Sequence, residues 1–136
     1  MEMWITSDVH ANLKHFTKAT NSLNKIEIAV LQAIINENKN IYPFLEDHYR
    51  SLYVINREMT GVGFYTNLWY QEEPNDTNLK INTCLSSTKT LLFDWFNFPI
   101  NYELAIDNGK MLFLEFVTNC SEAITIDPAD ISFRLE

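Results

Sequence analysis

Apolar residues follow a helical spacing in the first third of the chain. Val9, Leu13 and Phe16 recur at intervals of four and three residues, which predicts a helix over about 8–19 with Ser7 as its N-cap. These three side chains share one helix face. We therefore expect this helix to pack against the rest of the protein through a single stripe.

A second and better-marked helix is predicted from Asn24 to about Asn38. Asn24 followed three residues later by Glu27 is a capping-box pattern, in which each side chain accepts a hydrogen bond from the other residue's backbone. The apolar residues that follow cover more than one stripe, so this helix should be packed on two sides. Pro43 suits the first position of a third helix of about two turns.

After residue 52 the apolar period falls to about two, which is typical of strands. Asn108 and Gly109 tolerate the positive φ angles of a two-residue hairpin turn, so they predict a tight connection between two of these strands. Helices followed by antiparallel strands indicate an α+β fold, with N-terminal helices on one face of a curved, mainly antiparallel sheet. Six strands are predicted, over residues 52–59, 63–70, 79–85, 100–107, 110–117 and 131–135.

Length and charge narrow the class of protein. A chain of 136 residues predicts a single domain over 1–136, with a helical part over 1–51 and a β part over 52–136. The net charge is −8, and residues 61–136 hold eleven acidic and four basic side chains, a net charge of −7. An acidic domain repels phosphate backbones, so direct nucleic-acid binding is not expected. A basic protein is the favoured partner, since complementary charge speeds association.

The ends and the cysteines suggest a cytoplasmic protein. The first residues lack the basic and apolar regions of a secretory signal, and the chain has no apolar run of membrane-spanning length, so no membrane association is expected. Cys84 and Cys120 lie 36 positions apart without a CxxC pattern, and are interpreted as buried or half-buried thiols.

No residue pattern predicts catalysis, a metal or a cofactor. The histidines are His10, His15 and His48, and the first two are five residues apart, which places them on different helix faces. Gly61 and Gly63 lack both the third glycine of a dinucleotide loop and the lysine of a P-loop. They are interpreted as a tight turn or bulge between two strands.

Two segments stand out without a catalytic interpretation. Arg57 and Glu58 are neighbours in a predicted strand, so their side chains point to opposite faces, and an ion pair that holds the glycine turn is expected. The segment 93–99 carries four large aromatic rings together with Asp94 and a proline. These rings are open to two interpretations, core packing or contact with a partner.

The residues 57–66, Arg-Glu-Met-Thr-Gly-Val-Gly-Phe-Tyr-Thr, and the hairpin 104–116 ending in Leu114-Glu115 carry a resemblance. They resemble small bacterial proteins of uncharacterised function with an R-E-x-T-G-V-G-F element. More loosely, a stand-alone acidic α+β domain of this size is similar to immunity proteins of contact-dependent and other polymorphic toxin systems. This resemblance implies a cytoplasmic protein that binds and blocks one cognate toxin, often a nuclease.

The favoured hypothesis is therefore an immunity protein that occludes the basic cleft of a toxin domain. Acidic loops would imitate the charge of nucleic acid, and exposed aromatic rings would anchor the complex. The oligomeric state is left open. The residues predicted to contact the partner are Glu72, Glu73, Asp76, Asp94, Trp95, Asp127 and Asp130.

A small-molecule-binding protein or enzyme is the alternative function. Its site would lie between the helices and the concave face of the sheet, around Arg57, Glu58 and Tyr65. A purely structural adaptor is a third possibility, which an oligomer without partner or ligand would favour.

Overall fold

The computed structural model describes residues 23–74, 79–96, 98–118 and 127–136. These residues form an α+β fold in which seven strands make one sheet and helices cover one of its faces. The predicted fold class is confirmed, although the sheet has seven strands where six were expected. The elements are α2 (Lys25–Asn38), α3 (Phe44–Tyr49), β1 (Leu52–Met59), β2 (Gly63–Tyr70), β3 (Thr83–Leu85), β4 (Leu91–Phe93), β5 (Ile100–Asp107), β6 (Lys110–Thr118), the 3-10 helix η2 (Pro128–Asp130) and β7 (Phe133–Leu135).

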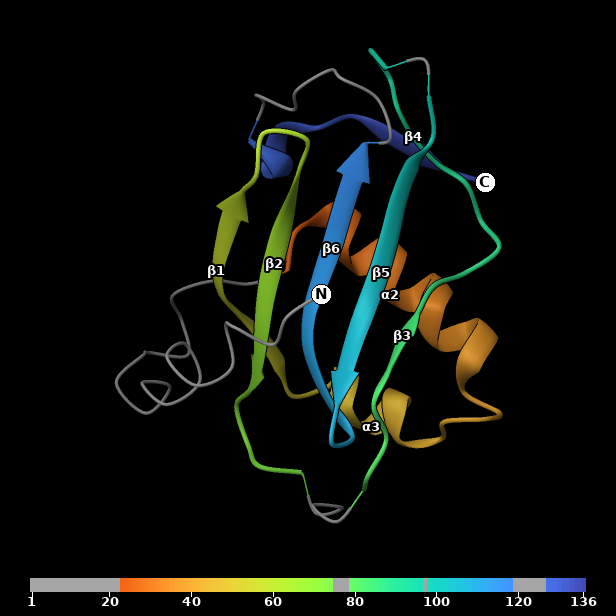
Figure 1. Ribbon diagram of the computed structural model, residues 1–136, viewed down its shortest axis with the longest axis vertical. Helices are drawn as coiled ribbons and strands as arrows, with labels where there is room; N and C mark the ends of the chain where they lie inside the picture. The colour runs from red at the N-terminus through yellow and green to blue at the C-terminus, as the bar shows by residue number, and fades with distance from the viewer. Residues whose placement is uncertain (1–22, 75–78, 97, 119–126) are drawn as a thin grey trace.

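Every strand pairing in the sheet is antiparallel, and the order is β1-β2-β6-β5-β4-β7. β3 also pairs with β5, along a different part of that strand from β4. Figure 1 shows α2 and α3 behind the curved sheet. We call the opposite face, which these two helices do not cover, the front face.

The local signals at the second helix are confirmed. The Asn24 side chain accepts a hydrogen bond from the Glu27 amide at 2.9 Å, and the Glu27 carboxylate accepts one from the Asn24 amide at 2.8 Å. Pro43 was predicted to be the first residue of the third helix, and it is the N-cap residue, immediately before that helix begins. The helix predicted over 8–19 lies outside the described residues.

The strands differ from the prediction mainly at one edge of the sheet. β3 covers only the last three residues of the predicted strand 79–85, and β7 the last three of 131–135. β4 was not predicted, because a strand of three residues is too short to show a period of two. It pairs with β5 at one residue and with β7 at three, so its existence depends on tertiary contacts.

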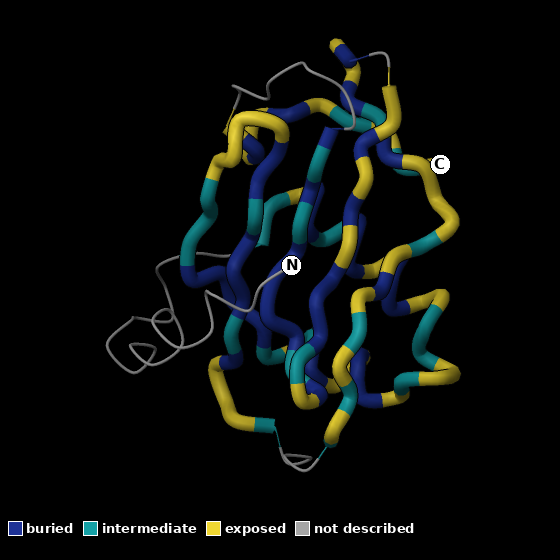
Figure 2. The backbone as a smooth tube through the Cα atoms, in the orientation of Figure 1, coloured by how far each residue is buried: buried dark blue, intermediate teal, exposed yellow. Residues whose placement is uncertain are grey.

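The core lies between the sheet and the helices, and Figure 2 shows buried residues recurring along the central strands. Ile26, Leu31 and Ile34 of α2 are almost completely buried against this face of the sheet. Phe64 and Phe116 stack there with ring centroids 4.5 Å apart. Each such side chain contributes about 1.5–3 kcal/mol by leaving water.

Neither helix of the described residues is long and apolar enough to span a membrane.

The β5–β6 hairpin turns at Asn108 and Gly109, as predicted. Their φ angles are +49° and +74°, the positive values that a two-residue hairpin turn requires. A bulge follows in the ladder, between Ala105 and Ile106, so that Leu112 of β6 has no partner of its own. This bulge shifts the register of the hairpin by one residue, which decides which side chains meet farther along the two strands.

Candidate functional site

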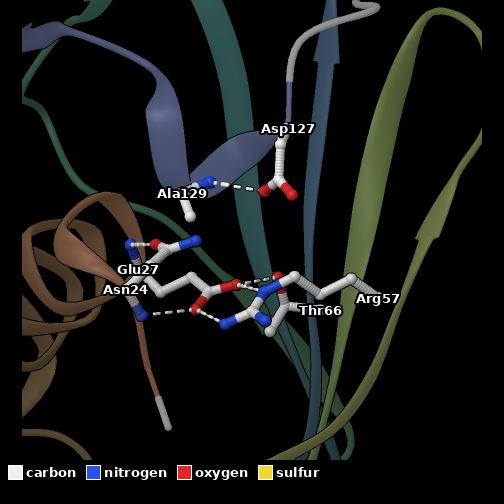
Figure 3. A network of polar contacts seen from close by, with 6 residues as sticks. All are labelled: Asn24, Glu27, Arg57, Thr66, Asp127 and Ala129. Carbon is white, nitrogen blue, oxygen red and sulfur yellow. Dashed lines mark hydrogen bonds and ion pairs between the residues drawn. The ribbon is translucent and has the colours of Figure 1, made fainter. Parts of the chain in front are cut away.

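Arg57 and Glu58 point to opposite faces of the sheet, as their adjacency in β1 predicts. Arg57 faces α2, where its Nε and Nη2 atoms each lie 2.7 Å from a carboxylate oxygen of Glu27 (Figure 3). The Thr66 hydroxyl donates to the same carboxylate at 2.5 Å. Arg57 therefore forms an ion pair, but its partner is Glu27 of the helix, so the pair joins α2 to β1 and does not have the expected role of holding the glycine turn.

This polar network is structural. Glu27 is completely buried, and its two oxygens accept from Arg57, Thr66 and the Asn24 amide. The hydrogen bond to Glu27 raises the pKa of Arg57, and the charges of Glu27 and Asp127 act in the same direction, whereas burial opposes them. Because Arg57 is held on the helix side, the structure does not bring it together with Glu58 and Tyr65 in one small-molecule site.

On the front face, Glu58, Tyr65, Glu115 and Glu103 are successive register partners across β1, β2, β6 and β5. We call the three carboxylates Glu58, Glu103 and Glu115 the acidic row. Glu103 and Glu115 are direct partners because of the bulge near the hairpin turn; without it, Glu103 would lie opposite Leu114. Three acids thus lie on one face, two from the β5–β6 hairpin and one from β1, which is distant from that hairpin in sequence.

Tyr65 lies within the acidic row and donates a hydrogen bond from its hydroxyl to Glu115 Oε2 at 2.9 Å. Partial burial, this hydrogen bond and the charges of Glu115 and Glu58 raise its pKa to about 12. The hydroxyl therefore stays protonated and remains a donor at neutral pH.

The environments of Cys84 and Asn67, two neighbours of the acidic row, also show that negative charge and hydrogen-bond acceptors dominate this face. Cys84 is exposed, so its interpretation as a buried or half-buried thiol is wrong. Desolvation and the charge of Glu103 still raise the pKa of this thiol, which disfavours a reactive thiolate. Asn67 is completely buried, and its side-chain amide donates to Asn56 at 2.6 Å and to Glu58 at 3.4 Å, while its Oδ1 has no hydrogen-bond partner in the described part of the chain. The carboxylates of the acidic row are acceptors, so a ligand of this face would be rich in donors. Cys120 lies outside the described residues.

An apolar patch lies beside the acidic row, toward the β5–β6 turn. Ala105, Leu112 and Phe113 are buried there, and Tyr65 and Trp69 pack against them. The rings of Tyr65 and Phe113 meet edge to face with centroids 5.4 Å apart. The front face therefore combines an acidic half with an apolar half.

A pocket of about 450 Å³ opens at the other side of the acidic row. It lies between the loop 86–90 and the start of β5. β3 pairs with residues 104–106 of β5 and β4 with Ile100 alone, so 101–103 have no strand partner on this edge. Glu103 and Glu115 belong to the lining, together with the hydroxyl-bearing residues Ser86, Ser87, Thr88 and Thr90.

The residues predicted to contact a partner do not form one surface. Figure 1 places the segment 71–74 at the lower end of the sheet, whereas 94–95 and 127–130 lie at the upper end. Glu72 and Glu73 are exposed, and Glu73 forms an ion pair with Lys110. Asp127 accepts from the Ala129 amide at 2.9 Å and so caps η2, on which Asp130 is exposed. Asp76 lies outside the described residues.

The aromatic segment divides between the two interpretations. Phe93 and Phe96 are buried, whereas Trp95 and Phe98 keep 43% and 55% of their surface exposed. Trp95 stacks on Phe93 with ring centroids 5.2 Å apart, and Asp94 beside it is exposed. Core packing thus holds for one pair of rings, and the other pair is accessible to a partner.

Metal ligands and known relatives give no further guide to function. Among the described residues no group of three or more histidine, cysteine, aspartate or glutamate side chains could hold a metal ion. His48 is buried, with its Nδ1 3.0 Å from the Tyr70 hydroxyl, while His10 and His15 lie outside the described part. Comparison of the chain with protein-family models, curated proteins and solved structures finds no match.

Proposed function

We propose that the protein binds a basic toxin domain and neutralises it by covering its active site, as an immunity protein does. The acidic row on the front face carries this proposal. No enzymatic step is assigned to the protein. Its effect would depend on occupying the cleft in which the toxin holds its own substrate.

The arrangement of the acidic row favours a basic partner. Like charges directly opposite each other in a sheet repel, and Glu103 and Glu115 stand in that relation. Within the described residues, no ion pair joins any member of the row to a basic side chain. Lysine and arginine side chains of a partner would remove this repulsion, and the field of the row would speed encounter by about 10–1,000-fold at low salt.

The exposed aromatic rings supply the apolar contact area that an interface needs in addition to complementary charge. Trp95 and Phe98 offer the large apolar surface that interface centres use, and Asp94 places a charge beside them. Of the other predicted contacts, Glu72, Glu73 and Asp130 are exposed at the ends of the sheet. We assign these three to the rim, where they steer the partner without anchoring it.

A binding measurement tests this function. The product of the neighbouring gene, purified with its catalytic residue inactivated, should form a stable complex whose association rate falls with added salt. Replacing Glu58, Glu103 and Glu115 by glutamine should slow association by about tenfold or more.

A matched control carries Glu46→Gln, Asp47→Asn and Glu136→Gln, which remove the same charge from exposed positions outside the row. This control should associate at nearly the rate of the unchanged protein. Absence of any stable complex, or equal rates for the two triple variants, would contradict the proposal.

A further inference from the structure

The pocket beside the acidic row has a wall that is already fixed in place. The Tyr102 hydroxyl donates to the Lys89 carbonyl at 2.7 Å and also bonds the Ser87 hydroxyl. Glu37 of α2 accepts from the Thr88 amide at 2.8 Å and from its hydroxyl at 3.1 Å. The loop 86–90 is thus tied to both the sheet and the helix, so a ligand would not have to order it.

The lining of this pocket is suited to a cation with several donors. Glu103 and Glu115 supply two adjacent carboxylates, and the loop 86–90 supplies hydroxyl groups that can also accept. Pro99 and Val117 add apolar surface that the methylene groups of a long side chain can contact. Lys89 is the basic residue of the lining, and it forms no ion pair among the described residues.

We propose that this pocket receives a guanidinium group, supplied in the complex by an arginine of the basic partner. The inference rests on the proposed function and names the partner group that the acidic row recognises. A guanidinium has five N–H donors in one plane, so it can bond both carboxylates and still reach the hydroxyls. An ammonium group makes only three such bonds from a single atom and would satisfy fewer of these acceptors.

A titration of the isolated full-length protein tests the pocket without the toxin. The probe is N-acetyl-arginine amide, followed by amide chemical shifts of the 15N-labelled protein. We expect saturable shifts confined to residues 86–90, 100–103 and 115–117, with a dissociation constant of about 1 mM. N-acetyl-citrulline amide has the same shape without the charge, and should bind at least about tenfold more weakly.

Variants decide whether the carboxylates are responsible. Glu103→Gln with Glu115→Gln should weaken binding of the arginine probe by about tenfold or more. Glu46→Gln, at an exposed carboxylate outside both the pocket and the proposed interface, should leave binding unchanged. Lys89→Ala should bind the probe at least as tightly as the unchanged protein, because it removes a like charge. Shifts that do not saturate, or equal binding of the arginine and citrulline probes, would overturn the inference.

The experiments can refute the arginine assignment and the proposed function separately. If the toxin complex forms and Glu103→Gln with Glu115→Gln leaves its affinity unchanged, the arginine assignment is wrong while the proposed function stands. If the arginine probe binds as expected but no basic toxin domain forms a complex, the proposed function is wrong. The assignment of a partner's arginine to the pocket is then wrong as well. A loss of both the probe and the complex in the double variant, with Glu46→Gln unaffected, would support the inference.

Discussion

Glu27 of α2 and Arg57 of β1 are joined by two N–O contacts of 2.7 Å, and the carboxylate is completely buried. The same carboxylate belongs to the capping box that begins α2. One side chain therefore both starts the helix and holds it against the sheet. Arg57 keeps 23% of its side chain exposed, so the pair lies at the edge of the core.

Arg57→Ala should destabilise the protein by about 3–5 kcal/mol, because it leaves a buried carboxylate without its partner charge. Chemical denaturation measures this loss. Arg50→Ala, at an exposed arginine paired with exposed Asp47, should change stability by less than about 1 kcal/mol. Combining Arg57→Met with Glu27→Leu should recover only part of the loss, since no unpaired charge remains but the Asn24 amide and the Thr66 hydroxyl lose their acceptor. Equal stability of the two arginine variants would contradict the structural role.

Gly61 and Gly63 lie at the turn between β1 and β2, and replacing each by alanine should reduce stability for a different reason. Gly61 has a φ of +90° and nothing within 4 Å of an added Cβ, so Gly61→Ala should cost about 1–2 kcal/mol through backbone strain alone. At Gly63 an added Cβ would lie 1.8 Å from the Phe116 carbonyl oxygen, which belongs to the neighbouring strand. Gly63→Ala should therefore cost more than Gly61→Ala in thermal unfolding. The exposed neighbour Val62 is the control, and Val62→Ala should have little effect.

Tyr65 predicts a loss of stability at high pH. Its pKa is raised to about 12 in the folded protein, from 10.0 for the unperturbed group. Between these values the unfolded chain releases a proton that the folded protein keeps, so this contribution to stability is complete below pH 10 and is lost as the pH rises toward 12.

Tyr65→Phe should reduce the slope of unfolding free energy against pH in that window, and should remove one late-titrating phenol from the absorbance titration. Tyr49→Phe serves as the matched control. An unchanged slope in Tyr65→Phe would contradict the assignment.

Tyr102 should control the rigidity of the loop 86–90. Tyr102→Phe removes the hydroxyl that bonds Lys89 and Ser87, at a cost of about 1 kcal/mol. Amide hydrogen exchange in this loop should become faster, while exchange in the β1–β2 pair stays unchanged. Unaltered exchange in the loop would show that the contacts from Glu37 suffice to hold it.

The two kinds of ring in the aromatic segment should respond differently to truncation. Phe93→Ala should destabilise by about 3–5 kcal/mol, because Phe93 is buried in the core. Trp95→Ala should cost less than about 1 kcal/mol, since much of its surface is exposed. A large loss on truncation of Trp95 would show that it serves the core and is not free to contact a partner.

Local signals in the sequence were sufficient for the main elements. The capping box of Asn24 and Glu27 and the turn at Asn108 and Gly109 depend only on residues within a few positions of each other. The pairing of Glu27 with Arg57 depends on how α2 packs against β1, thirty residues later, and no local pattern encodes that contact.

The candidate site was harder to predict for a geometric reason. Regular pairing from the hairpin turn would place Glu103 opposite Leu114 and on the other side of the sheet from Glu115. The single bulge near Ala105 brings the two acids together, and the sequence offers no glycine there to mark it. The charge excess of residues 61–136 was visible in the sequence, but its concentration on one face was not.

The strand order has a consequence for how the chain folds during synthesis. β2 lies between β1 and β6, so the sheet cannot close on the helix side until residues 110–118 have left the ribosome. The apolar face of α2 emerges long before the strands that bury it. The nascent chain therefore carries a helix whose apolar face is incompletely buried while residues 39–109 are made, and the centre of the sheet is completed only after β6 has been made.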